Sequence, residues 1–493
     1  MKRQLRHIVG AVALALIIAL GASKDASSQT DQLRPTFTET ACDLPALSST
    51  VLPRLRCGTI AVPRDHDNPS AGHFNLAVVV IRSVQQPSLP DPVVYINGGP
   101  GEPLTIYTDY QARHPYAARR DLILVDQRGT GRSEPRLCPD LNTRILQASI
   151  AVLTDMTDDS VARLLAIYMA CRDQAIAHGI ALTDFGTSTN VEDFEWVRKA
   201  LGITRWNVFG ESYGTTVAMT LVAKHPDTVR SVVLDSVYPP DPMPSRLSIA
   251  ASALEAFSSA CAHEEDCSAS FPDLAKTFDE TLDKLGRTPL MVSVPPSMHM
   301  TDDRVRLTAS LFKIVVDNLI YYPPAYPSLP RLIEAVHDGD TRDLGVALAS
   351  MLAEAAQLDL ADNAAVECRD RPHLRVPTAT TMTTLERLSS ICAHWSEPGP
   401  PPLIPVSTTV PTLVLVGQFD PVAGPELSRK IATAIGTNAR LVEFPRLGHN
   451  VRHFSPCAAT IVARFIEQPT EALDTTCANR RPPIRFLAKS QAP

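Results

Sequence analysis

This chain lacks the marks of several protein classes. Its 493 residues contain no run of lysines and arginines, and the formal net charge is −7, so nucleic acid is not an expected partner. None of the ten cysteines has the C-x-x-C spacing of a zinc site. The glycine-containing segment 126–133 has neither the lysine of a P-loop nor Rossmann spacing. We therefore expect no metal and no organic cofactor.

Long hydrophobic runs are also missing. The apolar run Ile8–Leu20 has 13 residues, which is too short to cross a bilayer comfortably. Basic residues precede this run and small residues follow it up to residue 28, which is the pattern of a secretory signal peptide over residues 1–28. This predicts a secreted or periplasmic protein with no stable membrane association after cleavage. An uncleaved anchor is the alternative.

The ten cysteines all follow the predicted signal peptide. An even number of cysteines in an exported chain favours disulfides. The cysteines fall into five sequential couples, so we expect nearest-neighbour pairing, which is best founded for Cys261–Cys267 because that loop is so short. The expected pairs are Cys42–Cys57, Cys138–Cys171, Cys261–Cys267, Cys368–Cys392 and Cys457–Cys477. The alternative is that several of these cysteines are free buried thiols.

Apolar patterning predicts alternating strands and helices in two parts of the chain. A helix over 188–201, with Ser188 or Thr189 as its cap, presents Val191, Phe194 and Val197 on one face. The strand 206–209, the helix 215–224 and the strand 229–234 then form a β-α-β unit, which implies a parallel sheet. The other expected strands are 59–62, 74–81, 93–96, 122–125, 412–416 and 440–444, and the other helices are 160–178, 426–435 and 458–466.

Two proline-rich links interrupt this alternation, at residues 239–244 and 398–405. Between them the sequence predicts helices with few strands. We therefore predict an α/β fold, a mostly parallel sheet flanked by helices, with a large helical cap inserted after the strand ending near Leu234. The expected division is a signal peptide at 1–28, a core at 29–238, a cap at 239–398 and the rest of the core at 399–493.

The strongest chemical signal is the segment Gly210–Gly214, which reads G-E-S-Y-G. A predicted strand ends just before it and a predicted helix begins just after it. This is the context of a nucleophile elbow, a tight turn that exposes a serine hydroxyl. Ser212 is therefore the expected nucleophile, and an ordinary turn on an inactive scaffold is the alternative.

A serine hydroxyl needs a base, and that base needs an orienting acid. In an α/β hydrolase the chain order is serine, acid, histidine. Asp420 follows the strand 412–416 and His449 follows the strand 440–444, so both belong at the sheet edge that carries the serine. Asp235 is the rival acid and His453 the rival base.

An acyl-transfer site also needs donors for an oxyanion. The backbone N–H of Tyr213 is one candidate, because it follows the nucleophile. Gly99, in the segment Asn97–Gly101, is the other, and a plain turn is the alternative for that loop. The segment 126–133 is interpreted as a structural loop with Arg128 in a buried ion pair, and direct substrate contact is the alternative.

Together these segments resemble a known family. The motifs at 97–101, 126–133, 210–214, 417–421 and 448–449, in this order, are similar to those of serine exopeptidases that include proline iminopeptidases and secreted tripeptidyl aminopeptidases. The segment Val62–Pro69, the couple Cys261 and Cys267 before Phe271–Leu274, and the block from residue 400 resemble the tripeptidyl branch. Asn97 stands where the iminopeptidases usually carry histidine, and Thr215 stands where a further glycine is usual.

The resemblance implies cleavage of amino acids or short peptides from free N-termini, among them tripeptides and proline-linked residues, through an acyl-enzyme. It assigns the triad to Ser212, Asp420 and His449. An aminopeptidase must also hold an ammonium group, for which a buried carboxylate is the natural partner. Glu211, Glu367 and Asp370 are the candidates, the last two preferred, and carboxylates without a substrate role are the alternative. An exported carboxylesterase or lipase, or a binding protein on the same scaffold, is the competing hypothesis.

Overall fold

A computed structural model describes residues 34–138, 142–146, 148, 158–238, 246–295, 304–371, 391–480 and 483–489. The predicted signal peptide and the first proline-rich link lie outside these residues. The chain divides into two units, Met1–Arg34 and Pro35–Pro493. Every element below belongs to the second unit.

The second unit is built on one sheet in the order β1-β2-β3-β5-β4-β6-β7-β10-β11. The six strands from β5 to β11 in this order pair in parallel, and β1, β2, β3 and β5 pair antiparallel. Strands β4 to β7 and β10 are buried almost throughout, as their continuous apolar sequences require. The bounds are β1 Phe37–Thr40, β2 Leu55–Pro63, β3 His73–Ile81, β4 Val93–Ile96, β5 Leu122–Val125, β6 Trp206–Glu211, β7 Val229–Asp235, β10 Thr412–Gly417 and β11 Ala439–Phe444.

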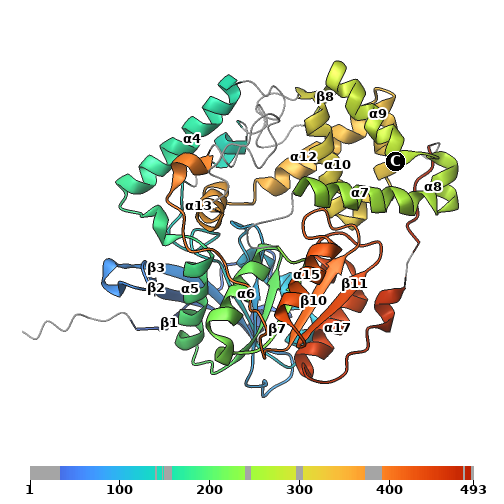
Figure 1. The fold of residues 1–493 in the computed structure, drawn as a ribbon. Helices are drawn as coiled ribbons and strands as arrows, with labels where there is room; N and C mark the ends of the chain where they lie inside the picture. The colour runs from blue at the N-terminus through green and yellow to red at the C-terminus, as the bar shows by residue number, and fades with distance from the viewer. Residues whose placement is uncertain are drawn as a thin grey trace, which may run out of the picture. The chain divides into compact units, whose positions relative to one another are not determined.

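Helices cover both faces of this sheet (Figure 1). One hydrophobic cluster contains the apolar sides of α5, α6 and α15, and another, on the alternate strand positions, contains that of α17. The expected parallel α/β architecture is therefore confirmed. The bounds are α2 Thr108–Gln111, α4 Asp158–Ala177, α5 Thr187–Ala200, α6 Tyr213–Lys224, α15 Pro425–Ile435, α16 Val451–Phe454 and α17 Pro456–Glu467.

The described residues between β7 and β10 are mainly helical. A small antiparallel pair, β8 and β9, lies among these helices. The side chains of α7 to α12 pack into a second hydrophobic cluster, which Phe419 and Phe486 also join, whereas those of α13 join the cluster of α5 and α6. The bounds are α7 Arg246–Ala262, α8 Glu265–Ser270, α9 Leu274–Arg287, β8 Leu290–Ser293, β9 Arg304–Leu307, α10 Ala309–Tyr321, α11 Leu329–His337, α12 Arg342–Ala355 and α13 Leu360–Asp370.

All five predicted disulfides are present and no cysteine is free. The predicted N-cap residue of α5, Ser188 or Thr189, was wrong. Gly186 occupies the N-cap position, and the helix begins at Thr187. The carboxylate of Asp370 accepts the Thr187 N–H there, so a residue distant in the chain replaces the local cap. Across the described ranges no single helix meets the length and hydropathy of a membrane span, and one bent pair, α12 with α13, meets them jointly.

Candidate active site

Ser212 lies in the turn between β6 and α6. Its backbone has φ +53° and ψ −123°, a left-handed conformation rare outside glycine. A Cβ at Gly210 would meet the carbonyl of Gly214, and one at Gly214 would collide with the carbonyl of Ile96. Only glycine therefore fits on either side of the turn, which holds Ser212 half-exposed in the geometry of a nucleophile elbow.

Asp420 and His449 form a buried pair at the same edge of the sheet. The Nδ1 of His449 lies 2.9 Å from both carboxylate oxygens of Asp420, and neither side chain is exposed. Burial alone would raise the pKa of Asp420, but the charge of His449 and hydrogen bonds from His449, Ala423 N–H and Val422 N–H keep that pKa below its ordinary value. The carboxylate therefore orients the imidazole and stabilises its protonated form.

The other nitrogen of His449, Nε2, is buried and has no hydrogen-bond partner among the described residues. It is therefore not hydrogen-bonded to Ser212 in this structure. The Tyr321 ring, at the end of α10, packs on the imidazole with 4.3 Å between ring centroids, and the Tyr321 carbonyl accepts the His449 N–H. Without substrate, hydrogen bonds between catalytic groups are often long or absent.

The segment Asn97–Gly101 follows β4 and lies against the serine. A Cβ on Gly98 would stand 2.9 Å from Ser212 Cβ and 3.3 Å from its Oγ. Tyr213 is the first residue of α6, so its N–H has no partner inside the helix. The structure thus brings the segment that contains Gly99 next to Ser212, which Tyr213 directly follows in the chain.

The two rival residues have other partners. The carboxylate of Asp235 accepts the N–H groups of Val451 and Arg452, while its backbone carbonyl accepts the N–H of Ser212. Burial and the nearby Glu211 raise the pKa of Asp235 to about 6. The Nε2 of His453 lies 2.8 Å from Glu211. Asp235 therefore joins the elbow to the loop after His449, and the geometry favours Asp420 and His449 as acid and base.

The carboxyl group of Glu102 lies near the imidazole, and that of Glu354 lies near Glu102. Burial, together with the negative charges of Glu211 and Glu354, raises the pKa of Glu102 to about 7, while the Tyr107 hydroxyl and His449 act to lower it. Partial desolvation also raises the pKa of Glu354, an exposed residue at the end of α12. A half-buried carboxyl group with a raised pKa, directly after the oxyanion loop, suits a cationic ligand.

The three carboxylates singled out for ammonium binding are engaged within the protein. Glu367 contacts the Tyr238 hydroxyl and, at 2.7 Å, Arg371. Asp370 accepts hydrogen bonds from Thr187. Glu211 accepts hydrogen bonds from three side chains, those of Tyr95, Arg452 and His453. Their substrate role stays a prediction.

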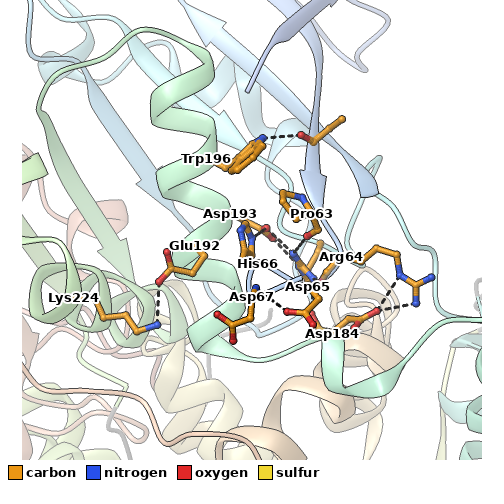
Figure 2. Close-up of polar contacts among 12 residues, drawn as sticks. Pro63, Arg64, Asp65, His66, Asp67, Asp184, Glu192, Asp193, Trp196 and Lys224 are labelled. Atoms are coloured by element: carbon orange, nitrogen blue, oxygen red, sulfur yellow. Dashed lines mark hydrogen bonds and ion pairs between the residues drawn. The ribbon is translucent and has the colours of Figure 1, made fainter. Parts of the chain in front are cut away.

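Arg128 forms the expected buried ion pair. Its guanidinium donates to both oxygens of Asp193, at 2.7 and 2.6 Å, and to the carbonyls of Pro63, Arg64 and Asp184. Figure 2 shows Asp193 between His66 and Pro63, with the Arg64–Asp184 and Lys224–Glu192 pairs around it. All five N–H donors of Arg128 are thus used inside the protein, which leaves none for a substrate.

A family model described as the alpha/beta hydrolase fold matches residues 91–456, which is well over half of the chain. The chain belongs to the α/β-hydrolase family. The match includes every residue of the candidate triad and of the oxyanion loop.

This α/β hydrolase has relatives named as peptidases. It is 31% identical over 200 residues to a tripeptidyl aminopeptidase of Streptomyces coelicolor, a match that covers 38% of this chain and 36% of the relative. It is 26% identical over 219 residues to a proline iminopeptidase of Xylella fastidiosa, covering 44% and 51%. The alignments thus span about a third to a half of these relatives. A solved α/β hydrolase from a Medee basin deep-sea metagenome library is 14% identical, covers 81% of this chain and 96% of its own, and has a TM-score of 0.41.

The sequence analysis did not identify several residues at the site. Glu102 follows the motif 97–101 directly, so its position beside the oxyanion loop was available from the sequence. Tyr321 and Glu354 had no such signal, because they lie in the helical insertion and reach the hydrolase site only through tertiary packing.

Proposed function

We propose that this hydrolase is an exported serine aminopeptidase that releases amino acids or short peptides from free N-termini. The observation that carries the chemistry is the buried Asp420–His449 pair at the sheet edge that carries Ser212, in which His449 Nε2 has no hydrogen-bond partner among the described residues. The relatives named as peptidases support peptides with free N-termini as the substrate class. The proposed products include tripeptides and proline-linked residues. Five disulfides support an oxidising compartment and hence export.

The proposed reaction proceeds through an acyl-enzyme. Ser212 Oγ attacks the scissile carbonyl carbon while His449 Nε2 takes the hydroxyl proton. The oxyanion that forms accepts hydrogen bonds from the N–H groups of Tyr213 and Gly99. His449 then gives its proton to the leaving amine as the C–N bond breaks. A water molecule, deprotonated by the same imidazole, releases the acyl group and restores Ser212.

The acidic surroundings of the site support an N-terminal specificity. The ammonium of a free peptide lies on the acyl side of the scissile bond, and Glu102 directly follows the oxyanion loop. Its ionised carboxylate, with that of Glu354, would form charge-assisted hydrogen bonds to the ammonium. An acetylated N-terminus would lose those bonds and leave a desolvated carboxylate.

The test is hydrolysis of peptide amides of one to three residues with free and acetylated N-termini, alongside short acyl esters. We expect release only from free N-termini, and its loss in Ser212→Ala. Ser350→Ala, which changes an exposed serine on α12, is the matched control and keeps full activity. Activity that survives in Ser212→Ala would refute the proposal, and cleavage of esters without cleavage of peptides would favour the carboxylesterase.

A further inference from the structure

Helix α13 belongs to the cap by chain position but to the core by packing. Five of its residues lie in the same hydrophobic cluster as α5 and α6: Ala361, Ala364, Ala365, Val366 and Cys368. The disulfide Cys368–Cys392 anchors the C-terminal half of α13 to a segment whose Cys392 and Trp395 lie in that cluster. The helix is therefore fixed to the sheet layer, independently of the separate cluster formed by α7 to α12.

The N-terminal end of α13 holds the oxyanion loop. Asn363 Nδ2 donates to the carbonyl of Pro100 at 2.9 Å, and the Asp359 N–H donates to the carbonyl of Gly101 at 2.8 Å. A Cβ at Gly101 would stand only 2.5 Å from the Asp359 carbonyl, so the two backbones are in close contact. These bonds fix the Pro100–Gly101 and Gly101–Glu102 peptide groups, which lie just after Gly99 in the loop.

The C-terminal end of α13 reaches the other oxyanion donor. Asp370 accepts the Thr187 hydroxyl at 2.6 Å, and the Thr187 Oγ1 lies 2.9 Å from the Tyr213 hydroxyl. Because the Thr187 proton points to Asp370, the Tyr213 hydroxyl donates to Thr187. Asn190 Nδ2 donates to that same hydroxyl at 3.2 Å, and all four side chains are buried. The backbone of Tyr213, which carries the second N–H donor, is thereby held through its own ring.

We infer that α13 is a brace that sets the position of both oxyanion donors, with Asn363 and Asp370 as positioning residues. One rigid helix contacts the Gly99 loop at one end and, through Thr187, Tyr213 at the other. Donors to a developing oxyanion act only when they are held in place before the reaction, within about 0.5 Å of the productive geometry. This inference rests on the proposed function, because it presumes Ser212 as the nucleophile.

Two variants test the two ends separately. Asn363→Ala removes the donor to Pro100, and Tyr213→Phe keeps the ring but removes the hydroxyl at the end of the Asp370–Thr187 chain. For each we expect kcat to fall by about 10- to 100-fold, since small misplacements cost that much, with KM within about twofold of the parent. Affinity for a peptide boronic acid, which mimics the tetrahedral intermediate, should fall in parallel with kcat.

The controls separate positioning from stability. Asn438→Ala removes a matched bond, from an Asn amide to the Thr408 carbonyl at 2.9 Å, away from the site, and should leave kcat unchanged. Asn363→Gln keeps a donor and should restore part of the lost kcat. Unchanged kcat in both variants would overturn the inference. It would also be overturned if kcat fell only because the melting temperature fell, with the boronate affinity of the folded enzyme unchanged.

The result for the wild-type enzyme distinguishes a failure of the proposed function from a failure of the inference about α13. Failure of a fluorophosphonate probe to label Ser212, with no Ser212-dependent hydrolysis, would refute the proposed function itself. Normal labelling and hydrolysis in the wild type, with Asn363→Ala and Tyr213→Phe behaving identically to it, would refute the brace alone.

Discussion

Glu211 is buried and Glu102 is half-buried near the elbow, and the two carboxyl groups differ in the groups that neutralise their charge. Burial would raise the pKa of Glu211, but the charges and hydrogen bonds of His453 and Arg452 bring that pKa below its ordinary value. Glu102 has no cation that outweighs burial, and its pKa is raised to about 7. Glu211 is therefore an internal ion-pair partner, and Glu102 is the carboxyl group that gains most from a cation supplied by a ligand.

This difference predicts a pH-dependent KM that depends on Glu102. Below about pH 7 its carboxyl group takes up a proton and loses its attraction for an ammonium, so KM for peptides with free N-termini should rise as the pH falls. Glu102→Gln should raise KM by roughly 10- to 100-fold at pH 8 and abolish that rise, because one charge-assisted hydrogen bond contributes roughly 1.5–3 kcal/mol.

Steady-state kinetics between pH 5 and pH 9 would check this prediction. Glu426→Gln, at an exposed glutamate on α15, is the control and should behave as the parent enzyme does. An equal rise in KM for an ester substrate without an ammonium would contradict the assignment, since Glu102 would then act on something other than the substrate's charge.

At the scale of elements, the elbow depends on the close approach of β4 and α6. Gly214→Ala would place a methyl group against the Ile96 carbonyl, which belongs to a buried central strand and has no room to move. We expect a loss of several kcal/mol of stability and of nearly all activity, at or beyond the upper end of overpacking costs of roughly 1–3 kcal/mol.

A matched substitution is available among the helices between β7 and β10. A Cβ at Gly286, inside α9, meets nothing within 4 Å, so Gly286→Ala should leave activity intact and add about 0.5–1 kcal/mol of stability. Thermal unfolding and kcat of the two variants would check both expectations. A Gly214→Ala enzyme with parental activity would show that the elbow tolerates a side chain.

The elements also explain how far the sequence argument reached. Strands β4 and β5 have the predicted bounds, because short apolar runs between turn residues are typical of buried parallel strands. The start of α5 was placed wrongly, because its first N–H is satisfied by Asp370, far away in the chain. Local patterns do not record such partners, and the same reason hid Tyr321 and Asn363 from the sequence argument.

At the scale of the whole molecule, disulfides are distributed over the core and the cap. Cys138–Cys171 closes a loop of sequence separation 33, and Cys261–Cys267 one of only 6. Longer closed loops remove more entropy from the unfolded chain, and a typical disulfide contributes about 2–4 kcal/mol. Full reduction should lower the thermal midpoint by on the order of 10 °C.

Two double variants refine this prediction. Cys138→Ser with Cys171→Ser should cost more stability than Cys261→Ser with Cys267→Ser, as measured by thermal unfolding without reductant. A reduced protein with an unchanged midpoint would contradict a stabilising role for these bonds, and a reversed order of the two pairs would contradict the loop-length argument.

The chain order of the site has a consequence for how the protein is made. The elbow, the oxyanion loop, the α13 brace, the acid and the base are synthesised in widely separated stages, with Asp420 and His449 last. A nascent chain that already displays Ser212 therefore has neither the carboxylate nor the imidazole that would activate it.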